Sequence, residues 1–262
     1  MVVTPVGPLH TSALARCIES VRRQSMRTEH IVVCDGFWPD GSVDLRGLQV
    51  LRTGARADDF GDTPRALGAA LALTEGAAVL AFLDADNWYH RDHVASLVRT
   101  WDNSSPAVLA SRRMLCEPSG RPIGRCEVSG YDHQFADTSC LALAGDAVSL
   151  GTAWGEVPAY AHPIGDRYFW AAICRRVPNL HLSGRVTVGY ATSHPADYER
   201  CGCMPPAVAK PHAGIRAAIE ATYFLQGQNH AITWKACAWE TLDSTVRQDW
   251  NTGQHDPDCI GR

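Results

Sequence analysis

Short apolar segments alternate with longer amphipathic stretches over the first hundred residues of the chain. Four mainly apolar segments have the length of a strand: Val2–Val6, Ile31–Cys34, Leu48–Leu51 and Ala78–Leu83. Apolar runs of this length are typical of strands that are buried on both faces inside a mostly parallel sheet. The pattern therefore predicts an α/β fold with these four segments in its central sheet.

Two amphipathic stretches between the predicted strands indicate helices. Thr11 or Ser12 can cap the first helix, and its apolar face carries Leu14, Cys17, Ile18 and Val21. Asp62 or Thr63 can cap the second helix, which has Pro64 in its first turn. We expect this helix to pack on the sheet through Leu67, Leu71 and the alanines between them.

The fourth predicted strand ends abruptly in two carboxylates, Asp84 and Asp86. Right-handed β-α-β connections make the strands parallel, which brings Thr4 and Asp35 to the same sheet edge. In open α/β sheets, ligands bind at the carboxyl ends of the strands. Side chains alternate along a strand, so both carboxylates point the same way and can approach one divalent cation. The alternative is a solvated acidic turn that Asn87 helps to close.

Further strands and helix starts are predicted in the middle of the chain. Ala107–Ser111 is expected to be a strand, and Cys116–Ser129 a loop or hairpin that turns at Gly120. The sequence then changes from polar to apolar over Asp137–Ala144, and Gly145 opens another helix. Further along, we expect a helix to start within 164–170, a strand over 186–190, and His194 directly after that strand.

Two helices are predicted in the last part of the chain, Val208–Leu225 and Ile232–Trp250, joined by a turn at 227–229. Their aromatic side chains can pack on the main domain, close a site or form a homodimer interface. We therefore predict a main domain over 1–204 and a C-terminal helical extension over 205–262.

The composition is that of an ordinary globular protein, with 262 residues, 45% hydrophobic and 20% charged. A net charge of −4 provides no general attraction to nucleic acid or to anionic membranes. No apolar run approaches the about 18 residues of a transmembrane helix, and the N-terminus lacks the pattern of a secretory signal. We therefore expect a cytoplasmic protein whose ten cysteines are mainly reduced thiols. Cys201 and Cys203 lack a second cysteine pair at zinc-ligand spacing, which leaves their role open.

Four short motifs in order resemble the family 2 glycosyltransferases of the GT-A fold. They are Thr4-Pro5, Asp35, Arg65-Ala66-Leu67-Gly68 and Asp84-Ala85-Asp86. The resemblance covers roughly residues 1–100, is fainter to about 200, and is absent beyond. Ala66 stands where the family usually has Asn, so a polar contact from that position is not expected. The Gln-x-x-Arg-Trp motif and transmembrane helices of processive membrane synthases are missing, which favours a soluble enzyme that makes single transfers.

The resemblance implies a GT-A domain that binds the nucleotide through about residues 1–100 and the acceptor through about 101–204. It implies an inverting transfer of a sugar from a nucleotide-diphosphate donor, most often UDP in this family, with Mn²⁺ or Mg²⁺. Thr4, Pro5 and Asp35 would contact the base. Arg65 would touch the base or a phosphate, unless it is an exposed helix arginine.

By the same resemblance, Asp84 would order the metal shell or the donor's ribose and sugar hydroxyls. Asp86 would bind the metal, and His194 would return to it from late in the chain.

The resemblance also suggests a catalytic base. Inverting members place a carboxylate at a helix start at about the position of Asp166, and one such base suffices to deprotonate an acceptor hydroxyl. Asp137 and Glu156 are alternatives, and Asp166 can instead be a helix cap, worth about 0.5–2 kcal/mol.

Two other functions stay open, a nucleotidyltransferase and a catalytically silent binding module of the same fold. The first normally has a basic Gly-rich loop after its first strand, whereas Val6–His10 contains one glycine and no Lys or Arg.

Overall fold

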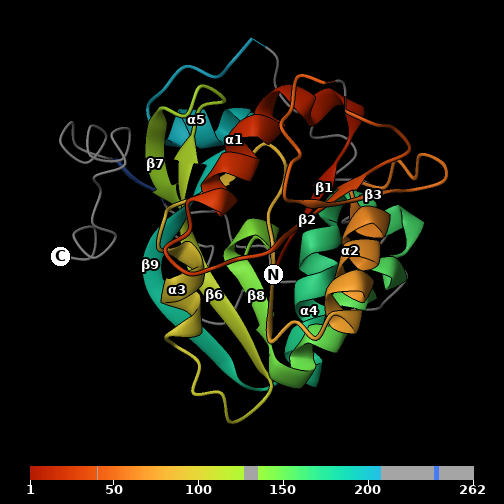
Figure 1. Ribbon diagram of the computed structural model, residues 1–262. Coiled ribbons are helices and arrows are strands. Elements are labelled where there is room, and N and C mark those ends of the chain that lie inside the picture. The colour runs from red at the N-terminus through yellow and green to blue at the C-terminus, as the bar shows by residue number, and fades with distance from the viewer. Residues whose placement is uncertain (40, 127–134, 208–238, 242–262) are drawn as a thin grey trace.

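The structure, a computed structural model, describes residues 1–39, 41–126, 135–207 and 239–241 (Figure 1). Its strands are β1 (Val2–Val6), β2 (His30–Cys34), β3 (Gln49–Arg52), β4 (Val79–Phe82), β5 (Trp88–Tyr89), β6 (Ala107–Cys116), β7 (Pro122–Cys126), β8 (Leu141–Ala144), β9 (Leu180–Ala191) and β10 (Trp239–Thr241). Together they form one sheet with the order β10-β7-β6-β8-β4-β1-β2-β3, and β9 pairs with β6 and β5 off this path. The predicted α/β class is confirmed.

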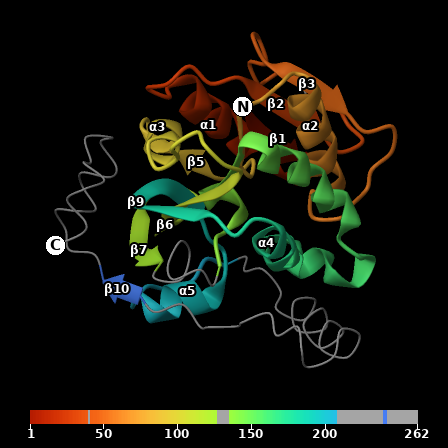
Figure 2. The ribbon, with the colours of Figure 1, turned by 90° about the horizontal axis from the view of Figure 1, so that it is seen from below.

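Helices cover both faces of this sheet (Figures 1 and 2). The α-helices are α1 (Thr11–Arg22), α2 (Asp62–Thr74), α3 (His93–Val98), α4 (Gly165–Arg176) and α5 (Pro195–Arg200). The 3₁₀ helices are η1 (Pro8–His10), η2 (Thr138–Cys140), η3 (Gly145–Glu156) and η4 (Ala159–Ile164). Figures 1 and 2 show α2 and α4 on one side of the molecule, with α1 and α3 together on another.

The half of the sheet formed by residues 1–82 is parallel, as predicted. β1 pairs in parallel with β2 and with β4, and β2 pairs in parallel with β3. The predicted apolar face of α1 is also confirmed, since its buried residues are Leu14, Cys17, Ile18 and Val21. The carboxyl ends of β1, β2 and β4 therefore meet at one edge of the sheet.

The predicted packing of α2 is wrong at Leu67, whose exposed fraction is 44%. Gly68 and Ala72 face the sheet together with the predicted Ala69, and the predicted Leu71 packs partly buried against the core. A Cβ atom on Gly68 would lie 2.5 Å from Val3 Cγ1 and 3.1 Å from Val33 Cγ2. Because glycine lets the helix approach the sheet this closely, the small residues lie underneath and Leu67 points outward.

The predicted helix caps are also wrong. The N-cap residue of α2 is Gly61, and Asp62 is the first residue of the helix. No side chain at the N-cap position therefore caps this helix. The carboxylate of Asp59 satisfies the helix start, because it accepts hydrogen bonds from Gly61 N at 3.2 Å and Thr63 N at 2.8 Å. In α1 the Thr11 hydroxyl donates backwards to Pro8 O at 2.7 Å. The Asp62 carboxylate therefore does not cap its own helix.

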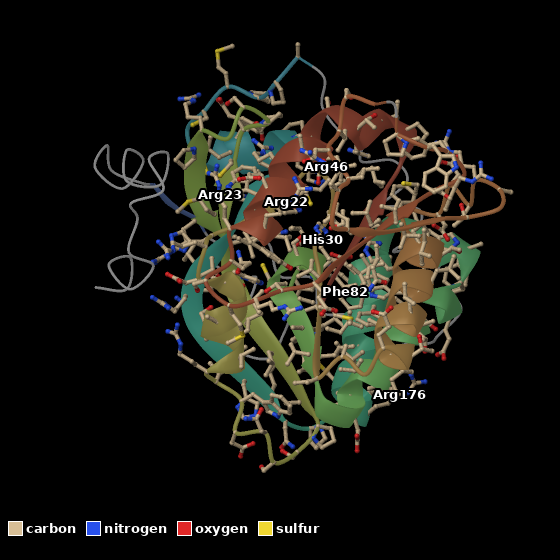
Figure 3. All side chains as sticks on the ribbon, viewed as in Figure 1. Arg22, Arg23, His30, Arg46, Phe82 and Arg176 are labelled. Atoms are coloured by element: carbon tan, nitrogen blue, oxygen red, sulfur yellow. The ribbon has the colours of Figure 1, made fainter. Side chains whose placement is uncertain are left out.

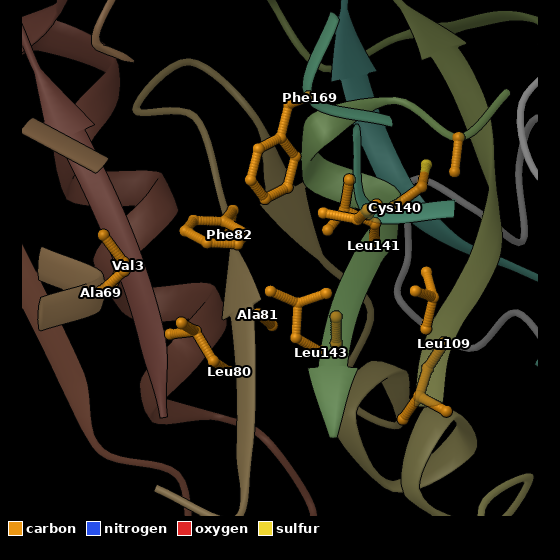
Figure 4. Packing of buried hydrophobic residues seen from close by; sticks show 14 of the residues in the cluster. Val3, Ala69, Leu80, Ala81, Phe82, Leu109, Cys140, Leu141, Leu143 and Phe169 are labelled. Atoms are coloured by element: carbon orange, nitrogen blue, oxygen red, sulfur yellow. The ribbon is translucent and has the colours of Figure 1, made fainter. Parts of the chain in front are cut away.

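β4 lies in the middle of the sheet, between β1 and β8. Its last residue, Phe82, is fully buried and meets the rings of Trp154 and Phe169 edge-on, with centroid distances of 5.9 Å. Figure 4 shows Phe82 and Phe169 side by side in this packing. Trp154 and Phe169 stack on each other at 4.1 Å. This aromatic packing holds η3 and α4 against the strand that leads into the two acidic residues.

The second half of the sheet is mixed. β8 pairs antiparallel with both β4 and β6, and β6 forms a hairpin with β7. The hairpin turns through Gly120, whose φ of +98° suits glycine, so the hairpin expectation for Cys116–Ser129 holds up to residue 126. The predicted strands at 107–111 and 186–190 are both found within longer ones.

The last described strand corrects the prediction for the end of the chain. Trp239–Thr241 pairs antiparallel with β7, so the predicted helix Ile232–Trp250 is wrong at these three residues. The predicted helix Val208–Leu225 lies outside the described residues, as does the remainder of the second one. Within the described part of the chain, no helix has the length and apolar character needed to cross a membrane.

Candidate active site

A tight turn places Asp84 and Asp86 directly after β4. Asn87 N donates to Asp84 O at 2.9 Å and closes this turn, as the sequence suggested. The Asn87 side chain ties the turn to two other elements, since it donates to Ser139 Oγ at 3.0 Å and accepts from Ala191 N at 2.9 Å. The turn is therefore anchored from β9 and η2, which a merely solvated acidic turn would not require.

Arg65 faces Asp84 from α2. Its Nη2 donates to Asp84 Oδ1 at 2.5 Å, and its Nη1 donates to Phe60 O at 3.0 Å. The guanidinium also lies over the Trp154 ring, 4.7 Å from the centroid. The side chain is only 8% exposed, so the alternative of an exposed helix arginine is wrong. Burial by itself would lower the pKa of Arg65, but Asp84 and Asp62 outweigh it and raise that pKa.

Asp62 and His162 form a second layer behind this pair. Asp62 Oδ1 lies 3.4 Å from Arg65 Nη1, and Asp62 Oδ2 lies 2.8 Å from His162 Nδ1. Burial raises the pKa of Asp62 to about 6, against the opposing effects of Arg65 and His162. Sequence reasoning missed His162 entirely and took Asp62 for a cap.

Asp86 lies on the side of the turn that faces α1 and η1. Its carboxylate is 3.9 Å from His10 Nδ1, and its backbone oxygen accepts a hydrogen bond from Arg16 Nη2 at 3.1 Å. The Arg16 guanidinium also stacks on the Trp88 ring at 3.8 Å. The Asp86 side chain is 26% exposed, so solvent reaches part of this carboxylate. Neither His10 nor Arg16 carries a motif that would have marked it in the sequence.

Asp35 follows β2, and both of its carboxylate oxygens bind the loop that follows β3. Oδ1 accepts from Ala57 N at 2.8 Å and from Thr53 Oγ1 at 3.2 Å, while Oδ2 accepts from Asp58 N at 3.1 Å. Asp58 and Phe60 in this loop have positive φ angles of 55° and 59°. Left-handed backbone at bulky residues is typical of binding loops. Asp35 thus organises the loop whose Phe60 oxygen holds Arg65.

Thr4 and Pro5 point to opposite faces of β1. The Thr4 hydroxyl is fully buried and lies 2.8 Å from His30 Nε2 and 3.6 Å from Cys17 Sγ, on the α1 face. Pro5 lies on the α2 face beside Gly61, where a Cβ atom on the glycine would be 3.1 Å from Pro5 Cβ. Of the two, Pro5 is the one directed toward the loop before Arg65.

Asp137 pairs with Arg113 on the other side of Asp84. Their short contact is buried, with side chains 7% and 10% exposed. Asp137 Oδ1 also accepts from Ser139 N at 3.1 Å, and Arg113 stacks on the Tyr190 ring at 4.1 Å. Burial raises the pKa of Asp137 to about 6, which Arg113 opposes and the charges of Asp84 and Asp166 reinforce. Arg113 escaped the sequence analysis because it lies beyond the predicted strand end.

Asp166 lies in the first turn of α4 and is half-buried. Its Oδ1 accepts a hydrogen bond from Arg167 N at 2.8 Å, and its charge acts on both Arg65 and Asp137. The alternative base Glu156 is 63% exposed and pairs with Arg176 at 3.4 Å. Figure 3 shows Arg176 at the end of α4. The charges of Asp84 and Asp166 thus both act on Asp137, whereas Glu156 lies at the surface.

The described residues contain no cluster of three or more His, Cys, Asp or Glu side chains that can hold a metal ion. His194 is the N-cap residue of α5, and its backbone N donates to Thr192 Oγ1 at 3.2 Å. Cys201 is buried, and the Cys203 thiol donates to Cys201 O at 3.5 Å. A metal site built from protein side chains alone is therefore absent from this part of the chain.

Residues 11–139 match the family model described as glycosyl transferase family 2. Over these residues, the chain belongs to that family. The order in which Asp35, Arg65 and the two acidic residues after β4 follow one another fits this assignment. No curated protein matches the chain.

Solved structures of TarS from S. aureus share the fold. TarS 1–349 in complex with UDP has a TM-score of 0.52 at 16% identity, over 76% of this chain and 63% of that chain. TarS 1–349 alone gives 0.55 at 15% identity over 76% and 62%, and its complex with UDP-GlcNAc gives 0.51 at 13% over 73% and 58%. The predicted GT-A fold is confirmed. The chain spans less than two thirds of each of these TarS chains.

Proposed function

We propose that this family 2 domain is an inverting glycosyltransferase that moves a sugar from a UDP-sugar to an acceptor hydroxyl with the help of a divalent cation. The observation that carries the proposal is the arrangement after β4. Asp86 is partly exposed there, and Asp84 is held by the buried Arg65 in a domain of this family. UDP is the first donor nucleotide to test because two of the similar TarS structures are complexes with UDP or UDP-GlcNAc.

The donor would lie along the edge formed by the ends of β1, β2 and β4. The loop that Asp35 organises would enclose the base, with Pro5 beside it, and Arg65 would face the phosphates. Arg65 is preorganised for this task, since Phe60 O and Asp84 fix its guanidinium before any ligand arrives. A guanidinium that is already oriented loses little side-chain entropy when it binds an anion.

The residues present fit a divalent cation that takes most of its ligands from the donor and from water. Mg²⁺ commonly binds through one or two carboxylates together with substrate phosphates, so a cluster of three protein ligands is not needed. Asp86 would supply one partly exposed carboxylate, and His194 is a candidate for a second contact. When bound, the cation would neutralise the charge that develops on the diphosphate leaving group.

Asp166 would act as the catalytic base. Asp137 is closed in its pair with Arg113, and Glu156 lies at the surface, so Asp166 is the half-buried carboxylate best placed to meet an acceptor. Its deprotonated carboxylate would take the proton of the acceptor hydroxyl as that oxygen attacks the sugar. Attack from the face opposite the leaving nucleotide converts an α-linked donor into a β-linked product.

The experiment is a thermal-shift screen of nucleoside diphosphates with and without Mn²⁺, followed by a transfer assay and determination of the product's anomeric configuration. Specific binding to the native state raises the melting temperature by mass action. We expect a shift with UDP that grows with Mn²⁺, and inversion in the product. Retention would contradict the role of Asp166, and binding without any transfer would favour a silent binding module.

A further inference from the structure

Asp62 lies where the starts of two helices meet. It is the first residue of α2, and its carboxylate lies against Gly165, the first residue of α4. A Cβ atom on Gly165 would lie only 2.9 Å from each carboxylate oxygen, so this close approach requires glycine. The Asp62 side chain is 3% exposed. The two helix starts are thus packed together around one buried carboxylate.

His162 closes this junction from the α4 side. It belongs to η4, the 3₁₀ helix that runs directly into α4, and its Nδ1 lies 2.8 Å from Asp62 Oδ2. On the opposite side, Asp62 Oδ1 faces Arg65, which binds Asp84 at 2.5 Å. A continuous series of polar contacts therefore runs from the start of α4 to the end of β4.

We propose that His162 is a positioning residue that acts through Asp62 to hold the first turn of α4, and with it Asp166, in a fixed place relative to the Arg65–Asp84 pair. The link between the helix starts is a property of the fold. Its consequence for turnover rests on the function proposed above, because only there is Asp166 given the role of base.

The charge of Asp62 does not serve the stability of the fold. Three charged or titratable groups face it, Arg65 from α2, His162 from η4 and Asp59 from the preceding loop, and burial still raises its pKa to about 6. Because the pKa of Asp62 is raised, its protonated form stabilises the fold relative to the unfolded chain. This contribution is fully present below the ordinary pKa of 3.8 and is lost as the pH rises through about 6. Ionised Asp62 therefore destabilises the fold at neutral pH, which is expected of a buried carboxylate whose role is to position neighbouring groups.

The test measures amide hydrogen exchange and steady-state kinetics on the full chain. The variants are His162→Ala, which removes the contact, and His162→Gln, whose amide can still reach Asp62. His181→Ala is the matched control, because His181 is a partly exposed histidine of β9 that lies near Asp102 and outside the site. Hydrogen exchange reports local opening of each helix start without reference to activity.

For His162→Ala we expect faster amide exchange at residues 62, 63, 65 and 66 and at residues 165–168. We also expect kcat to be lower by about 10- to 100-fold, the range for a misplaced catalytic group, with the KM of the donor changed less than twofold. His162→Gln should restore most of both properties, and His181→Ala should change neither. Unchanged exchange in His162→Ala, or faster exchange with normal kcat, would overturn the inference. A wild-type protein without transfer activity would refute the proposed function, and the exchange data would still decide whether the link exists.

Discussion

Two arginine–aspartate pairs flank the proposed donor and acceptor sides, and they differ in access to solvent. Arg65 and Asp84 meet at the end of β4, where the Asp84 side chain is 26% exposed. Arg113 and Asp137 meet between β6 and η2, where the Asp137 side chain is 7% exposed. Both arginines also lie over an aromatic ring, Trp154 in the first pair and Tyr190 in the second.

The difference in access separates a pair that can bind ligand from one that cannot. A partly exposed carboxylate can exchange one partner for another, so the open pair is suited to a donor with phosphates and hydroxyls. A closed pair has already lost its water and gains nothing by opening. Asp137 is therefore assigned to the scaffold, although its pKa of about 6 would otherwise suggest a catalytic role.

The largest effect on turnover is expected from replacing the proposed base Asp166, in comparison with replacing the buried Asp137. Asp166→Asn should lower turnover by about 10²–10⁴-fold, the range for losing general-base catalysis, while donor affinity barely moves. Asp166 is not the N-cap residue of α4, which is Ile164, and an Asn side chain can still accept the hydrogen bond from Arg167 N, so a purely structural Asp166 would keep near-normal turnover in this variant. Asp137→Asn should lose less than about tenfold. Steady-state kinetics of both variants measure this, and the opposite order would assign the base to Asp137.

The next effect concerns stability. Arg113→Met leaves Asp137 buried without its cation, which should lower the free energy of unfolding by about 3–5 kcal/mol at pH 8. Protonation relieves a buried carboxylate, so the loss should be smaller at pH 5, below the pKa of about 6 that Asp137 already has beside Arg113. Asp84→Asn should cost less, because the Asn side-chain oxygen can still accept from Arg65 and Asp62 remains beside the buried guanidinium. Urea unfolding at both pH values checks this, and equal losses in the two pairs would remove the distinction.

A smaller effect is expected at Asp35, which holds the loop that precedes Arg65. Asp35→Ala removes the acceptor of two backbone N–H groups in the loop before Arg65. Binding of UMP without metal should weaken about tenfold, because a hydrogen bond to a charged group contributes roughly 1.5–3 kcal/mol. Calorimetric titration with the monophosphate measures this, and an unchanged dissociation constant would place Asp35 outside the base pocket.

The sequence predicted the residues around the partly exposed Arg65–Asp84 pair better than those around the buried Arg113–Asp137 pair. The apolar runs of the first hundred residues predicted β1, β2 and β4, because a strand buried on both faces shows in its own composition. The position of Asp84 and Asp86 followed directly. Leu67 was placed on the wrong face because the sequence does not show that Gly68 allows a closer approach than a leucine would.

The contacts that hold the site were beyond sequence reasoning because they are long-range. His162 meets Asp62 across 100 residues, and Arg113 meets Asp137 between different elements. Neither residue belongs to a short motif. Arg65 was predicted as a ligand contact, but its partners Phe60 O and Trp154 became visible only in the fold. The end of the chain was predicted as helix because its aromatic spacing suits one, whereas Trp239–Thr241 joins the sheet edge.

The most direct test of the account is calorimetric titration of UDP into the wild-type protein and Asp86→Ala, each with and without Mn²⁺. Asp86 lies in a turn outside the apolar core, so the variant should keep the wild-type melting temperature. We predict that Mn²⁺ tightens UDP binding to the wild type by at least about tenfold, or 1.4 kcal/mol, and has no effect on the variant. An equal strengthening by Mn²⁺ in both proteins would contradict the assignment of Asp86 as the metal ligand and, with it, the proposed organisation of the donor site.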